Sequence, residues 1–173
     1  MSSLNIGLVN KIEVKSIGKP GERTFNISVS NENGSLLIWM EKEQLLQLGM
    51  SLNRFISTNE SNSDPTSFTS KQTVLEFVNI EFKTTEMSLT YDSYSDMFTL
   101  TAHVPYQSAD LDTDIQAVIF NFSRIQAQDL SKTALKVVAS GRSPCPLCGG
   151  PLDPTGEHFC VKKNGHNIGN VTK

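Results

Sequence analysis

The 173-residue sequence predicts an α+β fold in which two strand-rich halves each end in a helix, with a small zinc ribbon at the C-terminus. Three observations lead to this prediction. Apolar and polar residues alternate in several short segments, as they do in half-buried strands. Two longer segments carry apolar residues at helical spacing. All three cysteines lie between Cys145 and Cys160. We therefore expect an α+β core at residues 1–141 and a metal-binding tail at residues 142–173.

The first half, residues 1–57, reads as extended segments followed by a helix. Residues 6–16 are extended, and a turn rich in glycine and proline follows at 18–21. Alternation at 25–29 predicts a strand, which a hairpin with an Asn-Gly pair at 31–34 connects to a returning strand at 36–40. A helix then begins near Glu41, because acidic residues stabilise the positive end of its dipole. Its expected apolar face consists of Leu45, Leu48, Gly49, Leu52, Phe55 and Ile56.

Residues 58–71 are rich in serine, threonine and asparagine, and this composition predicts a mobile linker. The second half, residues 72–141, repeats the plan of the first. Segments at 74–83, 87–91, 98–104 and 115–122 read as extended, with a turn at 92–96.

The second helix begins with a capping box, because Ser123 is followed three residues later by Gln126. We expect the helix to end at Gly141, a residue that suits the left-handed conformation after a helix. Residues 40–44 align with residues 122–126 at an offset of 82, although few residues are identical. The sequence therefore predicts a pseudo-repeat, in which the two halves share the order of strands and helix rather than identical residues. The expected apolar face of this helix consists of Ile125, Ala127, Leu130, Ala134, Val137 and Val138.

The net charge and the lengths of the apolar runs argue against some classes of protein. The net charge is −3. Proteins that bind phosphate backbones usually carry a basic patch, so this charge gives little support to nucleic-acid binding. No apolar run approaches the ~20 residues of a membrane helix, and the N-terminus lacks a cationic start followed by an apolar leader. We therefore expect a cytoplasmic protein without membrane contact. An odd number of clustered cysteines argues against a disulfide framework and favours a metal site.

The cysteines form the pattern Cys-x2-Cys-x9-His-x-Cys, which is typical of a zinc ribbon. Cys145 and Cys148 are close enough along the chain to reach one ion, and a hairpin would bring His158 and Cys160 to the same ion. Four such ligands close the tetrahedron of Zn²⁺, so the predicted ion is structural rather than catalytic. His166 is an alternative fourth ligand, because it also lies near Cys160 in the sequence.

The segments 141–149 and 158–160, with Asn164 and Gly165, resemble the C-terminus of an uncharacterised bacterial family from actinobacteria and chloroflexi. The resemblance covers nearly the whole chain, because 18–25, 41–44, 81–83 and 89–92 also resemble family segments. It implies His158 as the fourth ligand, because the family has histidine two residues before the third cysteine, and often tyrosine at the position of His166. The chain departs from the family pattern at Glu157, which lengthens the loop by one residue. The family implies no established activity.

Three functions remain open on this sequence. The favoured one is a non-enzymatic binding or adaptor protein, whose partner is another protein and whose zinc is structural. The second is a nucleic-acid-binding accessory factor, which Arg142, Lys162 and Lys163 in the tail support and the net charge opposes. The third is an enzyme with a site near Arg23, since a guanidinium after a tight turn suits anion binding. Arg23 is also a candidate contact for a partner protein.

Overall fold

The computed structural model describes residues 2–19, 21–58, 79–105, 115–140 and 145–147, together with Leu152 and Cys160. This part of the chain forms an α+β fold of two mixed sheets and two helices. The strands are β1 (Ser2–Leu8), β2 (Lys11–Ile17), β3 (Thr24–Asn31), β4 (Gly34–Met40), β5 (Ile80–Lys83), β6 (Met87–Asp92), β7 (Met97–His103) and β8 (Ile115–Ser123), and the helices are α1 (Lys42–Thr58) and α2 (Arg124–Ala139).

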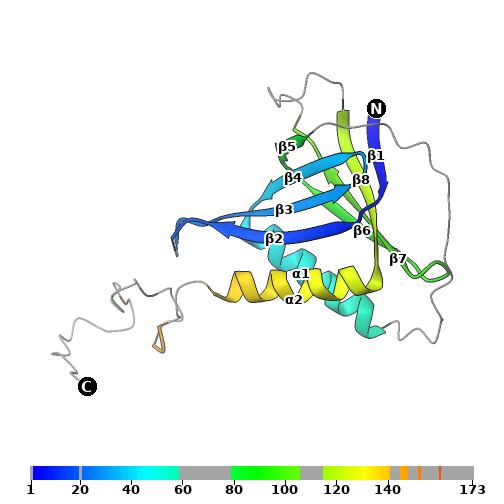
Figure 1. Cartoon of the computed structure of the whole chain (residues 1–173). Coiled ribbons are helices and arrows are strands. Elements are labelled where there is room, and N and C mark those ends of the chain that lie inside the picture. Colours follow the sequence, from blue (N-terminus) through cyan, green and yellow to red (C-terminus); the bar gives the residue numbers. More distant parts are fainter. Residues whose placement is uncertain are drawn as a thin grey trace.

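Each sheet contains three consecutive strands from one half of the chain and one strand from the other half. One sheet has the order β2-β3-β4-β5, and the other has the order β1-β8-β7-β6 (Figure 1). In the first sheet, β5 is parallel to β4, and the other neighbours are antiparallel. In the second sheet, β1 is parallel to β8, and the other neighbours are antiparallel. The halves are therefore intertwined through their exchanged first strands, β1 and β5.

The helix starts confirm the sequence offset of 82 residues. The backbone N–H of Glu41 donates to Oε1 of Gln44 at 2.8 Å, and the backbone N–H of Ser123 donates to Oε1 of Gln126 at 2.8 Å. The capping box expected at Ser123 is complete, because the Ser123 side chain also accepts from the Gln126 amide. Each pair supplies partners for backbone groups that the first turn of a helix leaves unbonded.

The same two glutamines tie the helices to the exchanged strands. Nε2 of Gln44 donates to the carbonyl of Thr85, just after β5, at 3.1 Å. Nε2 of Gln126 donates to the carbonyl of Val9, just after β1, at 3.0 Å. Each glutamine thus caps its own helix and holds a strand from the other half, so the two halves repeat a tertiary contact as well as a pattern.

Residues 6–16 were expected as one extended segment, and the structure divides them at Val9 and Asn10. The Val9 amide donates to the carbonyl of Asn121 in β8, while the Asn10 amide donates to the carbonyl of Ser30 in β3. The chain passes from one sheet to the other at this point, which alternation of side chains does not reveal.

One residue of the predicted apolar helix faces was wrong, because Ile125 is 72% exposed. It lies on the side of α2 opposite the buried Ala134, because the nine residues between these positions make two and a half turns at about 3.6 residues per turn. Helix α2 ends at Ala139 with Ser140 as its C-cap. The predicted C-cap Gly141, the segment 74–78 and linker residues 59–71 lie outside the described residues.

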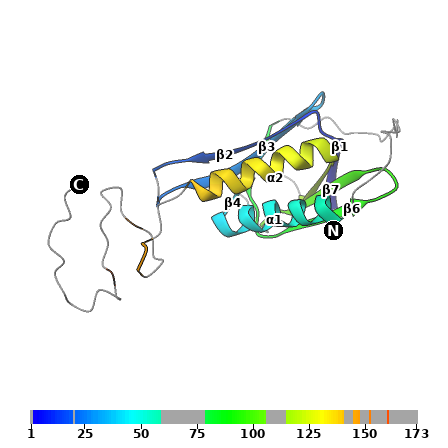
Figure 2. The same ribbon diagram turned by 90° about the horizontal axis from the view of Figure 1, so that it is seen from below.

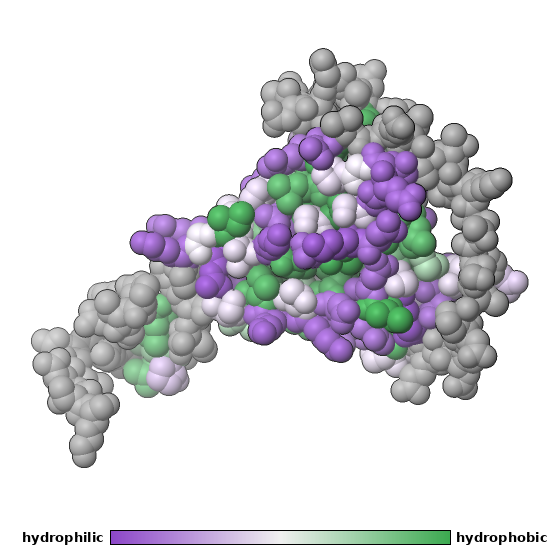
Figure 3. Space-filling view, in the orientation of Figure 1, coloured by the Kyte–Doolittle hydropathy of each residue, from purple (hydrophilic) through white to green (hydrophobic). Residues whose placement is uncertain are grey.

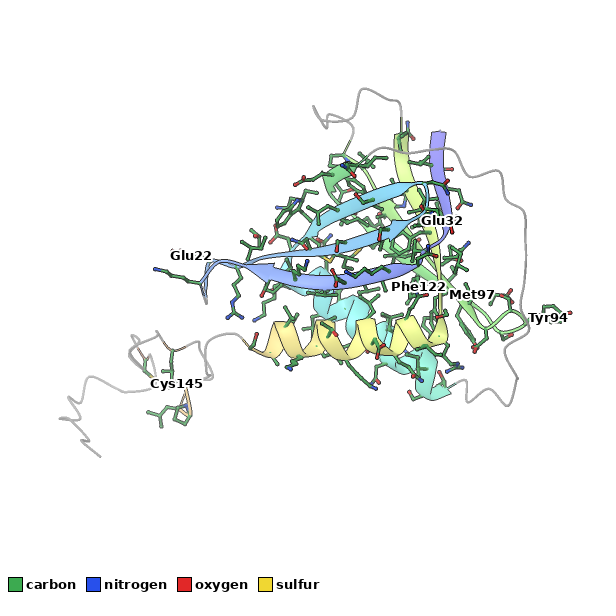
Figure 4. The ribbon with its side chains drawn as sticks, in the orientation of Figure 1. Glu22, Glu32, Tyr94, Met97, Phe122 and Cys145 are labelled. Atoms are coloured by element: carbon green, nitrogen blue, oxygen red, sulfur yellow. The ribbon has the colours of Figure 1, made fainter. Side chains whose placement is uncertain are left out.

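The core lies between the two sheets and the helices, which pack against each other and against strands of both sheets (Figure 2). Three fully buried phenylalanines form its aromatic centre, with Phe122 in the interior (Figure 4). The Phe98 and Phe122 rings lie 5.7 Å apart, and the Phe120 and Phe122 rings lie 5.9 Å apart. These distances fall within the range of favourable aromatic pairs.

Helices α1 and α2 are in close contact at Gly49 and Ser131, which are also separated by 82 residues. The Ser131 hydroxyl, buried in the crossing, donates to the Gly49 carbonyl at 2.8 Å. A Cβ atom at Gly49 would lie 3.2 Å from Leu135 Cδ2 and 3.3 Å from Ala134 Cβ. Glycine therefore allows the two helix backbones to come close enough for this hydrogen bond.

Two substitutions of Gly49 test how closely the helices approach each other, because alanine adds a small side chain and leucine a large one. In Gly49→Ala, the helix propensity gained, about 0.5–1 kcal/mol, offsets the tight contact, so stability should change little. In Gly49→Leu, the side chain forces the helices apart, and the free energy of unfolding should fall by about 2–3 kcal/mol. Urea unfolding of both variants measures the difference. Equal stability of the leucine and alanine variants would contradict the close crossing.

In the part of the chain that the structure describes, neither helix is long and apolar enough to cross a bilayer.

Candidate metal centre

The structure brings two of the predicted zinc ligands together. Cys145 Sγ and Cys160 Sγ lie 3.9 Å apart, although 15 residues separate them in the sequence. This distance is far longer than the about 2.05 Å of a disulfide bond. It is close to the separation of two sulfur ligands on one tetrahedral zinc, which is about 3.8 Å for Zn–S bonds of about 2.3 Å.

A backbone donor points at one of these sulfurs. The amide of Leu147 donates to Cys145 Sγ at 3.4 Å from a turn at Pro146 and Leu147. The turn after the first cysteine therefore places a backbone donor beside this sulfur.

Cys145 is buried with 6% of its surface exposed, and Cys160 is half-buried. Cys145 lies beyond the C-terminal end of α2 (Figure 4). The other predicted ligands, Cys148 and His158, and the alternative His166 lie outside the described residues. Among the residues that are described, no group of three or more metal-ligating side chains occurs.

The predicted contact residue Arg23 binds the end of a helix. Its Nη1 atom donates to the carbonyl and to the hydroxyl of Ser140, both at 2.9 Å. Ser140 is the C-cap of α2, where the helix dipole places partial negative charge. Arg23 therefore joins the turn between β2 and β3 to the C-terminus of α2, close in sequence to the start of the tail.

A second arginine, Arg124, was missed as a site residue from the sequence. Its Nε atom donates to Asp96 Oδ1 at 2.8 Å, and Nη2 donates to the Tyr91 hydroxyl at 3.2 Å. Burial, followed by the hydrogen bond from the hydroxyl to Asp96, raises the pKa of Tyr91. Nη1 of Arg124 also donates to the carbonyl of Ile56 near the C-terminus of α1 at 3.2 Å. At the C-terminal end of each helix, a backbone carbonyl thus accepts a hydrogen bond from an arginine that lies outside that helix.

Lysines lie on the outer face of the β2-β3-β4-β5 sheet, but each has an acidic neighbour. Lys11 and Lys15 contact Glu13 at 2.9 and 3.4 Å, and Lys83 contacts Glu41. Over β2, β3 and β4, Figure 3 shows hydrophilic residues interrupted by apolar ones. Acidic side chains therefore lie beside these three lysines on the described part of the sheet.

These features define an α+β protein with two intertwined mixed sheets, two crossed helices and a pair of cysteine sulfurs beyond the second helix. The chain belongs to the family described as protein of unknown function DUF3090, whose profile matches residues 5–160. No curated protein and no solved structure matched the chain.

Proposed function

We propose that the chain binds one structural Zn²⁺ through Cys145, Cys148, Cys160 and His158, and that it acts as a non-enzymatic binding protein. The observation that carries the metal site is the 3.9 Å separation of the Cys145 and Cys160 sulfurs. Two sulfurs this close can both bind one tetrahedral Zn²⁺, on which sulfur ligands lie about 3.8 Å apart. Cysteines without a disulfide bond suit the reducing cytoplasm.

The ligand set supports a structural role for the ion. Three thiolates and one imidazole fill all four positions of a tetrahedral zinc, so no position is left for water or substrate. Short segments cannot bury enough apolar surface to fold alone, and metal binding then supplies the folding free energy. The ion is therefore proposed to organise residues 142–173.

Two sets of contacts bear on the three roles that the sequence leaves open. Arg23, the residue suggested for an enzymatic site, donates to Ser140 at the end of α2, which supports a structural role for this arginine. The ion pairs of Lys11, Lys15 and Lys83 weaken the case for nucleic acid. These observations weaken the enzymatic and nucleic-acid alternatives, so the binding protein stays the favoured proposal.

Mass spectrometry of the purified, untagged protein is expected to find about one zinc per chain. Cys148→Ser should lose the metal while the core keeps its cooperative unfolding, because the described core residues form one cluster without the cysteines. His158→Ala should weaken zinc binding in competition with a chromogenic chelator. His166→Ala should leave it unchanged.

His103→Ala is the matched control, since His103 lies in β7 and not in the tail. A wild-type protein without zinc would contradict the metal proposal, and the cysteines would then require redox chemistry. Loss of zinc in His166→Ala but not in His158→Ala would reassign the fourth ligand.

A further inference from the structure

An open cleft lies between helix α1 and the edge strand β6, on the core rather than in the tail. Its volume is about 420 Å³, and α1 contacts β6 beside it. Five of the residues that line the cleft are apolar, namely Leu48, Phe55, Met87, Leu89 and Leu100. Gln47, Ser51 and Glu86 are among the polar residues that line it. The lining is therefore mixed, and a cleft that combines apolar side chains with polar groups can bind a peptide through both.

Strand β6 offers backbone groups at this cleft. The His103 amide donates to the Glu86 carbonyl at 2.9 Å, and the β6–β7 register pairs Ser88 with Thr101. Because bonded residues alternate along an antiparallel ladder, the backbone groups of Met87, Leu89 and Tyr91 point to the outer edge of β6. No other described strand pairs with that edge.

The other sheet protects its edges, whereas β6 does not. Edge strands β2 and β5 carry Lys11, Lys15 and Lys83, and α2 packs against β2. Lysines and covering helices are the usual means by which proteins prevent pairing at sheet edges. The outward-facing residues of β6 are Ser88, Thr90 and Asp92, so this edge carries no cation. Its half-buried side chains face the core side, next to α1.

From this geometry we infer that the α1–β6 cleft binds an extended segment of a partner protein, which pairs with β6 as an added strand. The inference rests on the proposed role as a binding protein and names the chemistry of its partner. Backbone hydrogen bonds to Met87 and Leu89 hold the segment, and its alternate apolar side chains enter the cleft. Glu86, the acidic residue that lines the cleft, selects a segment with a lysine or arginine near that end.

The test is selection of a phage-displayed library of random heptapeptides on the full-length protein. Enriched peptides are expected to alternate apolar and polar residues and to contain a cation. The synthesised peptide should slow hydrogen exchange at the Met87 and Leu89 amides, because these amides acquire acceptors. A peptide that contacts the protein elsewhere would leave these two amides unchanged, which would overturn the inference.

Two tryptophan variants at neighbouring positions of α1 test whether the peptide binds in the cleft or elsewhere on the helix. Ser51→Trp fills the cleft and should weaken the peptide by roughly tenfold or more. Met50→Trp adds the same side chain at an adjacent position that is 58% exposed and does not line the cleft, and it should bind normally. Glu86→Gln should weaken a cationic peptide by roughly two- to fivefold, as expected for an exposed ion pair. Far-ultraviolet circular dichroism checks that each variant is folded.

The inference is overturned if no peptide is enriched, if binding is equal in Ser51→Trp and Met50→Trp, or if the enriched sequences carry helical rather than alternating spacing. Its failure is separable from failure of the zinc site. Cys148→Ser should lose zinc and still bind the peptide, because the cleft lies within residues 44–100. If the wild-type protein contains no zinc but binds the peptide, only the metal proposal is contradicted.

Discussion

Residues 1–58 and residues 59–173, prepared as separate polypeptides, are expected to remain unfolded alone and to fold when they are mixed. The reason is the exchange of first strands between the halves. Strand β1 of the first polypeptide pairs with β8 of the second, and β5 of the second pairs with β4 of the first. Neither polypeptide alone can complete a four-stranded sheet or cover its core face.

The helices add to this dependence. Helix α1 packs on α2 through the Gly49 crossing, and each of Gln44 and Gln126 binds the carbonyl of a residue in the other half. Separation would therefore expose the inner sheet faces and the helix contact together. The apolar surface lost from the core is the dominant stabilising contribution in folding, so the effect is loss of the fold rather than partial weakening.

Circular dichroism and analytical ultracentrifugation measure the outcome at low micromolar concentration. The mixture should show a cooperative thermal transition and a one-to-one complex, and the single polypeptides should not. The uncut chain of residues 1–140 is the matched control and should fold without the tail. A polypeptide 1–58 that folds as a monomer would contradict the intertwined arrangement.

The local features of this fold were predictable because they depend on near neighbours in the sequence. The Asn31–Gly34 hairpin and the Ser123 capping box are formed by residues at most three positions apart. The apolar face of α1 followed from its period, and Leu45, Leu48 and Leu52 are buried as expected. The offset of 82 residues was visible at the helix starts, where each capping pattern is local.

The exchange of β1 and β5 was not predictable, because alternation tells which side of a strand is buried and not which strand lies beside it. The same limit applies to the arginines. Arg23 was noticed after a tight turn, but its partner Ser140 is 117 residues away. The sulfurs of Cys145 and Cys160 lie 3.9 Å apart, as the spacing typical of zinc ribbons predicts, and the zinc site itself stays a prediction. The cleft between α1 and β6 could not be predicted, because no motif or spacing in the sequence indicates it.

Replacement of Arg124 by methionine is expected to cause the largest loss of stability among single substitutions outside the core. The Arg124 and Asp96 side chains are only 14% and 27% exposed, and their ion pair lies at 2.8 Å. Removing one partner of a buried pair costs about 3–5 kcal/mol. Partial exposure lowers this cost, so we expect the free energy of unfolding to fall by about 3 kcal/mol.

The geometry explains why methionine cannot substitute. The guanidinium holds three acceptors from separate elements at once, namely the Asp96 carboxylate, the Tyr91 hydroxyl and the Ile56 carbonyl. Its carbon also lies 5.6 Å from the centre of the Tyr91 ring, within the range of a cation–π contact. Methionine retains the apolar stem but leaves the carboxylate without its cation.

Urea unfolding of Arg124→Met, Asp96→Asn and the double variant measures the pair in a double-mutant cycle. Asparagine suits position 96, where the backbone φ is 53°, because it tolerates the left-handed conformation. Arg54→Met is the control, since Arg54 is an exposed arginine on α1, and it should change stability by less than about 0.5 kcal/mol. A coupling of about 1 kcal/mol or more would support the pair as a clamp that joins the β6–β7 turn and the start of α2 to the end of α1. Additive single effects would show instead that Arg124 acts through its other contacts alone.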